Sequence, residues 1–169
     1  MRALWQRFVS TGLQEGLDPA HRKNVIVLNT LVALVIPTQL SLVPVAIYLR
    51  EFGTTPLLWV TALMLALQIL VLACNASHHY SLARILFAFS GINNIALSTL
   101  IAGTETYAQF LMPAVMIGAF YYFPHEERKS LFVMVALSVF ALVFLEFGRV
   151  TPLIKVPANI LPTAHSLVI

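Results

Sequence analysis

Long apolar blocks separated by short polar segments dominate the hydrophobic pattern of this chain. The blocks cover residues 25–49, 56–74, 82–102, 107–123 and 130–147. As α-helices, these blocks are long enough to cross the hydrocarbon core of a bilayer, which is about 30 Å thick. Their apolar residues are continuous and do not alternate with polar ones as in an outer-membrane barrel. The pattern therefore predicts an all-α fold, a polytopic transmembrane helical bundle with five spans.

The segments that flank this predicted bundle, 25–147, differ in character. Residues 1–24 combine basic and apolar side chains, which indicates an amphipathic segment on the cytoplasmic surface of an anionic membrane. Asp18 and Pro19 predict the N-cap and first turn of the helix that follows. Residues 148–169 are punctuated by proline, so we expect a tail or the start of a sixth span. In the second case the chain is a six-span module cut short.

The composition agrees with a membrane location. The mean hydropathy is +0.87, and only 10% of the residues are charged, against about a quarter in soluble proteins. The single cysteine, Cys74, excludes an intrachain disulfide and a cysteine-based metal site. The net charge of +3 is too small to indicate a nucleic-acid partner. The lipid bilayer is therefore the first partner that we expect.

The distribution of lysine and arginine predicts the orientation of the bundle. With the N-terminus inside, seven basic residues fall on cytoplasmic segments and three on outer ones. The cytoplasmic set is Arg2, Arg7, Arg22, Lys23, Arg84, Arg128 and Lys129, and the outer set is Arg50, Arg149 and Lys155. Because cytoplasmic loops carry an excess of basic residues, this count predicts a cytoplasmic N-terminus.

A polar segment between the third and fourth spans predicts a ligand pocket. Ionisable and amide side chains near hydrocarbon are costly, so Glu105 within this segment indicates function. Together with polar residues of the adjoining spans it would line a pocket open to the outer side, for a small amphipathic ligand. The candidate residues are Asn93, Asn94, Thr104, Glu105, Thr106, Tyr107, Gln109 and Glu146. The alternative is that the carboxylates are hydrated at the interface and that the asparagines only join helices.

Other motifs give weaker signals. Ala114 and Gly118 have the small-xxx-small spacing that brings two membrane helices close together, so we expect helix packing there. Four histidines, His21, His78, His79 and His125, fall on the predicted cytoplasmic face, but a bis-histidine haem site would need them within the spans. No phosphate loop, nucleophile elbow or HExxH motif occurs. The sequence therefore predicts no metal, no cofactor and no catalytic residue.

The order of three polar segments resembles that of a known membrane module. Residues 102–113 read AGTETYAQFLMP, residues 123–128 read FPHEER, and residues 144–147 read FLEF. Together with Arg22-Lys23-Asn24 this order is similar to the multi-span N-terminal membrane domain of bacterial adenylate/guanylate cyclases and related sensor histidine kinases. The resemblance covers roughly residues 18–147. It implies a six-helix module of the bacterial inner (cytoplasmic) membrane that anchors, dimerises and regulates a cytoplasmic catalytic domain.

Two hypotheses about function follow. The first is a non-catalytic membrane sensor or regulatory and dimerisation module of a signalling receptor, normally attached to a cyclase or kinase domain. Neither catalytic domain is present in this chain, so we do not expect it to be an enzyme. The alternative is a structural accessory subunit of a larger membrane complex, for example an energy-converting one. The first predicts a homodimer, and the second predicts association with other membrane subunits.

Overall fold

The computed structural model describes residues 2–48, 53–103 and 108–148 and is all-α within them. Its six α-helices are α1 (Arg2–Val9), α2 (Pro19–Tyr48), α3 (Thr55–Ala76), α4 (Tyr80–Ala102), α5 (Met112–Tyr122) and α6 (Arg128–Phe147). Two short 3-10 helices, η3 (Ala108–Leu111) and η4 (His125–Glu127), precede α5 and α6. By length and composition, α2, α3, α4 and the helical segment His125–Phe147 could each cross a membrane. These four helices indicate an integral membrane protein.

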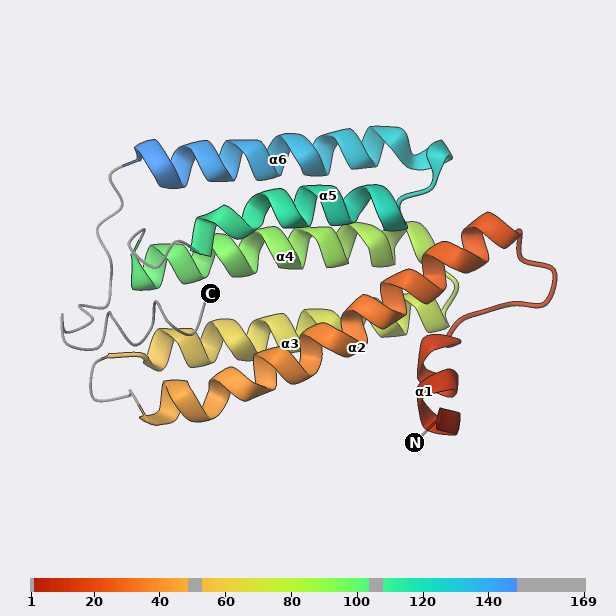
Figure 1. Cartoon of the computed structure of the whole chain (residues 1–169), viewed down its shortest axis with the longest axis horizontal. Coiled ribbons are helices and arrows are strands. Elements are labelled where there is room, and N and C mark those ends of the chain that lie inside the picture. Colours follow the sequence, from red (N-terminus) through yellow and green to blue (C-terminus); the bar gives the residue numbers. More distant parts are fainter. Residues whose placement is uncertain (1, 49–52, 104–107, 149–169) are drawn as a thin grey trace.

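The fourth predicted span, 107–123, is shorter than the others in the structure. Its apolar helical part covers Ala108–Tyr122, and the first turn of this part is a 3-10 helix. Pro113 stands at the start of α5, where its missing N–H has no helical partner in any case. The helix α5 lies alongside α4 and α6 and is shorter than either (Figure 1).

The long helices lie side by side along the long axis of the molecule (Figure 1). The helix α4 contacts α3, α5 and α6, whereas α2 contacts α3 and α5. The start of α2 matches the capping signal in the sequence: the Asp18 carboxylate accepts hydrogen bonds from the backbone N–H groups of Ala20 (3.0 Å) and His21 (3.4 Å). The helix therefore begins at Pro19, several residues before the predicted apolar block.

The surface of the bundle is apolar, as expected for contact with lipid. Trp59, Ile69 and Phe140 are 74%, 64% and 69% exposed. A soluble protein rarely exposes contiguous apolar surface of this extent. In a bilayer the same side chains would meet acyl chains, so their exposure to water would be avoided.

The helix α1 runs across one end of the bundle, the end at which α2 begins and α3 ends (Figure 1). We call this the α1 end. Asn29 of α2 is fully buried there, and its Nδ2 donates hydrogen bonds to the backbone carbonyls of Val9 (3.0 Å) and Thr11 (2.9 Å). Asn75 of α3 donates from Nδ2 to Asn29 Oδ1 at 2.7 Å. This amide pair ties the turn after α1 to two membrane helices.

A second set of contacts holds the same turn. The Tyr80 hydroxyl, at the start of α4, donates a hydrogen bond to the carbonyl of Gly12 at 2.5 Å. Gly12 has φ +81°, and a Cβ at this position would lie 2.1 Å from Asn75 O. Only glycine fits such a left-handed, close-packed position. Two helices, α2 and α4, therefore donate hydrogen bonds to the chain around this turn, and α3 supports it indirectly through the bond from Asn75 to Asn29.

The same end carries a buried ion pair. Arg84, in the second turn of α4, is 1% exposed and donates from Nη1 to Glu127 Oε1, just before α6. The attraction between two opposite charges offsets part of the solvation energy that both lose on leaving water. The pair joins α4 to the segment between α5 and α6, so it fixes the α1 end of three helices.

Candidate functional site

A cavity of about 330 Å³ lies midway along the bundle, between α2, α3, α4 and α5. We call it the central cavity. It is lined by Leu31, Val35, Gln39, Gln68, Phe87, Ser90, Gly91, Asn94, Ile95, Leu111, Ala114, Val115, Gly118 and Tyr122. The volume is at the lower end of the range of about 300 to 1,000 Å³ that ligand pockets occupy.

Helical periodicity explains which residues reach this cavity. The helix α2 contributes Leu31, Val35 and Gln39, which are four residues apart and therefore share one face. The helix α4 contributes positions 87, 90, 91, 94 and 95, and α5 with its preceding turn contributes 111, 114, 115, 118 and 122. Each set follows the spacing of a single helical stripe. The helix α3 contributes only Gln68.

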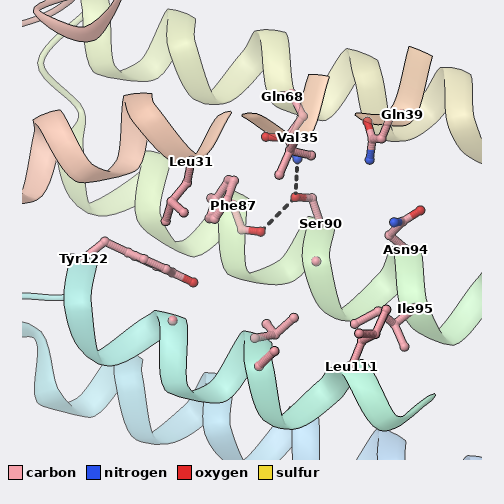
Figure 2. Close-up of a pocket in the computed structure, with 14 residues that line it drawn as sticks. Leu31, Val35, Gln39, Gln68, Phe87, Ser90, Asn94, Ile95, Leu111 and Tyr122 are labelled. Atoms are coloured by element: carbon pink, nitrogen blue, oxygen red, sulfur yellow. Dashed lines mark hydrogen bonds between the residues drawn. The ribbon is translucent and has the colours of Figure 1, made fainter. Parts of the chain in front are cut away.

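A chain of hydrogen bonds fixes the orientation of Gln68. The Ser90 hydroxyl donates to the Phe87 carbonyl at 2.8 Å, as helical serines often do toward the preceding turn. Its single hydrogen is then used, so Ser90 Oγ can only accept, and Gln68 Nε2 donates to it at 2.9 Å (Figure 2). Gln68 must therefore turn its amide oxygen away from Ser90. Within the described residues, this oxygen is buried and has no hydrogen-bond partner.

Gln39 is the second buried amide with an unpaired oxygen. Its side chain is 5% exposed, and Oε1 has no partner in the part of the chain that the structure describes. Figure 2 shows the carboxamides of Gln39 and Asn94 at the same end of the cavity, approaching from α2 and α4. Burying an amide group without a hydrogen bond costs about 1–3 kcal/mol. Two glutamines that line the cavity therefore each bury an amide oxygen that has no donor among the described residues.

The other end of the cavity is aromatic. Phe87 and Tyr122 meet edge to face, with ring centroids 5.4 Å apart and planes at 87°. Figure 2 shows the Tyr122 side chain extending from α5 toward Phe87 and Leu31, with its hydroxyl at the far end. The cavity thus has a polar end formed by amides and an apolar end formed by rings and a branched side chain.

No lining residue carries a charge. A charged molecule would lose its hydration here without gaining a counter-ion, and the cost would be several kcal/mol. The arrangement fits the binding of a neutral molecule through hydrogen bonds and apolar contact. Acid–base catalysis needs a titratable group with a suitable pKa at the reacting atom, and the lining offers only the Tyr122 phenol.

The residues of the predicted outer pocket fall in different places. Asn94 lines the central cavity. Asn93, one position earlier, is not among the lining residues and donates from Nδ2 to the Phe89 carbonyl at 2.8 Å. Gln109 is buried in η3, and Glu146 is exposed near the end of α6. Thr104, Glu105, Thr106 and Tyr107 lie outside the described residues.

The two small residues on α5, Ala114 and Gly118, both lie on the cavity wall. A Cβ added to Gly118 would have only Tyr122 Cε1 within 4.0 Å, so open space adjoins this position. Gly91 of α4 has closer neighbours, because an added Cβ would lie 3.4 and 3.5 Å from the methyl groups of Val115. The tight contact between α4 and α5 therefore passes through Gly91. Close packing of a neighbouring helix backbone against Ala114 and Gly118 stays a prediction.

Gln39 and Gln68 are the site residues that sequence reasoning missed. Both carry a signal, since an amide within an apolar block indicates a buried hydrogen bond or a site. Gln68 is the one side-chain amide in the block 56–74. The two adjacent asparagines of the third span gave a stronger signal for a site than a single glutamine, although only one of them lines the cavity.

Comparison of the chain with protein-family models, with curated proteins and with solved structures gave no match.

Proposed function

We propose that this chain is a non-catalytic sensory and dimerisation module of a bacterial inner-membrane signalling receptor, with its N-terminus in the cytoplasm. The observation that carries the proposal is the central cavity, a space of ligand size within the bundle whose wall includes the polar residues Gln39, Gln68 and Asn94. The resemblance to the membrane domains of cyclases and sensor kinases supports it. In this proposal the chain crosses the membrane five times, with α5 as the short fourth span.

A ligand in the central cavity would act on the packing of the helices. The cavity is bounded mainly by α2, α4 and α5, with Gln68 from α3, so a bound molecule would contact several helices at once. If the helices have two packings, a ligand shifts their populations only by its difference in affinity for the two. The hydrogen bonds at the α1 end then connect α2 and α4 to the turn after α1, on the proposed cytoplasmic side.

Purification from the native membrane in mild detergent tests this proposal. Intact mass and the identity of every co-migrating protein are measured together. A homodimer, or a longer parent chain with a cyclase or kinase domain, is the expected result. Unrelated subunits at fixed stoichiometry with an intact mass near 18.7 kDa would contradict it.

The accessory-subunit alternative has one observation in its favour. The helix α6 exposes a row of large aromatic side chains: Phe132, Phe140, Phe144 and Phe147. Such a row suits a partner helix as well as lipid. The two hypotheses separate at the cavity, because Asn94→Ala should impair a sensor's response and leave the assembly of an accessory subunit intact.

A further inference from the structure

The helix α1 extends sideways from the bundle, which covers only part of it. Its C-terminal part is held, because Phe8 packs against the core and the Val9 carbonyl accepts a hydrogen bond from Asn29. Its N-terminal part lies farther from the long helices (Figure 1). Trp5 is 47% exposed there, although it shares a helix face with Phe8, three residues later. A large apolar side chain is therefore held in a fixed place without protein to cover it.

The depth of α1 in a membrane follows from the lengths of the long helices. At a rise of about 1.5 Å per residue, α3 and α4 are about 33 and 35 Å long, close to the hydrocarbon thickness of about 30 Å. Asn75, in the last turn of α3, donates to Asn29, which donates to the turn after α1. This turn is therefore level with the end of α3, at the boundary between hydrocarbon and headgroups. Residues 19–28 of α2 extend about 15 Å beyond it, to the depth of the headgroups.

The charged side chains of the described residues gather at the α1 end. Six exposed basic residues lie there: Arg2, Arg7, Arg22, Lys23, Arg128 and Lys129. Three exposed carboxylates lie at the same end: Glu15, Asp18 and Glu126. At the opposite end, Glu146 is the one charged side chain that the structure describes. The α1 end therefore carries an excess of positive charge, which is complementary to the negative surface of a membrane that contains anionic lipids.

We infer that α1 is an interfacial helix and that, with the start of α2, it binds anionic phospholipids in preference to zwitterionic ones. The Trp5 ring lies at the upper end of the acyl chains, because indole rings favour the membrane interface. Arg7, on the side of α1 away from Trp5, and Arg22 and Lys23 on the start of α2 lie at the depth of the lipid phosphates. Basic residues opposite an apolar face are typical of helices that lie in the plane of the interface. The inference goes beyond the proposed function, since it applies equally to a sensor and to an accessory subunit.

The two tryptophans of the chain allow a direct test, because they lie at opposite ends of the bundle. Trp59 is 74% exposed near the start of α3, at the end away from α1. Trp59→Phe leaves Trp5 as the only emitter, and Trp5→Phe leaves Trp59. Each full-length variant is reconstituted in phosphatidylcholine that contains brominated phosphatidylcholine or brominated phosphatidylglycerol at equal mole fraction. Bromine on an acyl chain quenches a tryptophan that it touches, so the two quenching curves give the relative binding constant of the two lipids.

The anionic lipid should quench Trp5 more strongly than the zwitterionic one. Each basic residue near an anionic surface contributes about fivefold in affinity, so the relative binding constant at Trp5 should be at least about fivefold. It should approach one at 1 M salt, where the Debye length is about 3 Å. Trp59 should show a clearly smaller preference for the anionic lipid.

Charge-removing variants locate the binding on α1. In the Trp59→Phe chain, Arg7→Gln should lower the preference at Trp5 several-fold. Arg128→Gln is the matched control, because it removes the same charge at the start of α6, on the other side of the bundle from α1 (Figure 1). Both arginines are exposed, and each variant is first checked for native helicity and an unchanged elution volume.

Three results would overturn the inference. Equal quenching of Trp5 by the two lipids would exclude a preference for anionic lipid. Quenching of Trp59 without quenching of Trp5 would show that protein or water covers α1 in place of lipid. An equal loss of preference in Arg7→Gln and Arg128→Gln would assign the effect to the net charge of the chain and not to α1. The proposed function fails separately, if the native chain is found only with unrelated subunits.

Discussion

The α1 end and the central cavity both bury amide side chains, but they use them differently. At the α1 end, Asn29 makes three hydrogen bonds that join α2 to α3 and to the turn after α1, although Asn75 Oδ1 beside it has no partner among the described residues. In the central cavity, Gln39 Oε1 and Gln68 Oε1 have no partner within the described residues. A paired amide between helices stabilises their packing, whereas a buried amide oxygen without a partner reduces stability.

The ion pair of Arg84 and Glu127 belongs with the first region. Arg84 keeps two unpaired nitrogens, Nε and Nη2, in the described part of the chain. It is not among the residues that line the central cavity, so these nitrogens do not define a ligand pocket. The two regions therefore differ in what adjoins their buried polar groups, and substitutions in each should change stability by different amounts.

Gly12→Ala should have the largest effect. The new Cβ would lie 2.1 Å from Asn75 O at a residue with φ +81°, so the turn must leave its site. We expect a loss of about 3 kcal/mol in the free energy of unfolding, from overlap and backbone strain together. Gly16→Ala is the control, because φ is +88° there and nothing lies within 4 Å of the added Cβ. It should cost about 1 kcal/mol. Thermal unfolding in detergent and protease cleavage before α2 measure the difference, and equal effects would contradict the docking of α1.

Glu127→Gln should have the next largest effect. It removes the negative partner of an arginine that is 1% exposed, and an unpaired buried charge is strongly destabilising. We expect a loss of about 2 kcal/mol, below the full cost of breaking a buried pair because Glu127 is partly exposed. Glu126→Gln, at the exposed neighbouring position, should change the melting temperature little. A loss of similar size in both variants would show that Arg84 does not depend on Glu127.

Asn29→Leu and Gln39→Leu should shift stability in opposite directions. The first leaves the Val9 and Thr11 carbonyls without their donor and should cost about 2 kcal/mol. The second removes an amide whose oxygen is already unpaired, so it should be neutral or stabilising by up to about 1 kcal/mol. Melting temperatures of the two variants in one detergent decide the point. A marked fall in the melting temperature of Gln39→Leu would mean that the Gln39 amide stabilises the fold. The cavity would then use its buried amides as the α1 end does, to hold helices together.

The sequence was sufficient to predict the class of fold because apolar length alone identifies membrane helices. The four long helices match apolar blocks, and Asp18 caps α2 as its position before Pro19 predicts. Helix ends were less accurate: α2 continues through residue 24, where the pattern placed a boundary, since capping and not hydropathy decides where a helix begins. The short fourth apolar block shows the limit of a length criterion, because its helical part within the described residues, Ala108–Tyr122, is shorter than the other spans.

The candidate site was harder to predict than the fold. Periodicity in α4 separates Ser90 and Asn94, which face the cavity, from Asn93, which donates a hydrogen bond within its own helix. Which residues of α2 and α3 lie opposite depends on how these helices pack, and a single sequence does not contain that information. Gln68 illustrates the point, since its role depends on Ser90, a residue of the next helix.

Gly118→Val should have the smallest effect on stability, so it is a sensitive test of whether open space adjoins this position. An added Cβ would meet only Tyr122 Cε1, at 4.0 Å, so the new side chain can extend into the central cavity without displacing backbone. Valine also has a slightly higher helix propensity than glycine, so the free energy of unfolding should change by less than about 1 kcal/mol. Gly91→Val is the matched control on the facing helix, where the methyl groups of Val115 lie 3.4 and 3.5 Å from an added Cβ. That substitution should separate α4 from α5 and lower the melting temperature clearly. If Gly118→Val were the more destabilising of the two, the space beside Gly118 would be closed in solution, and the contrast between the two regions would fail.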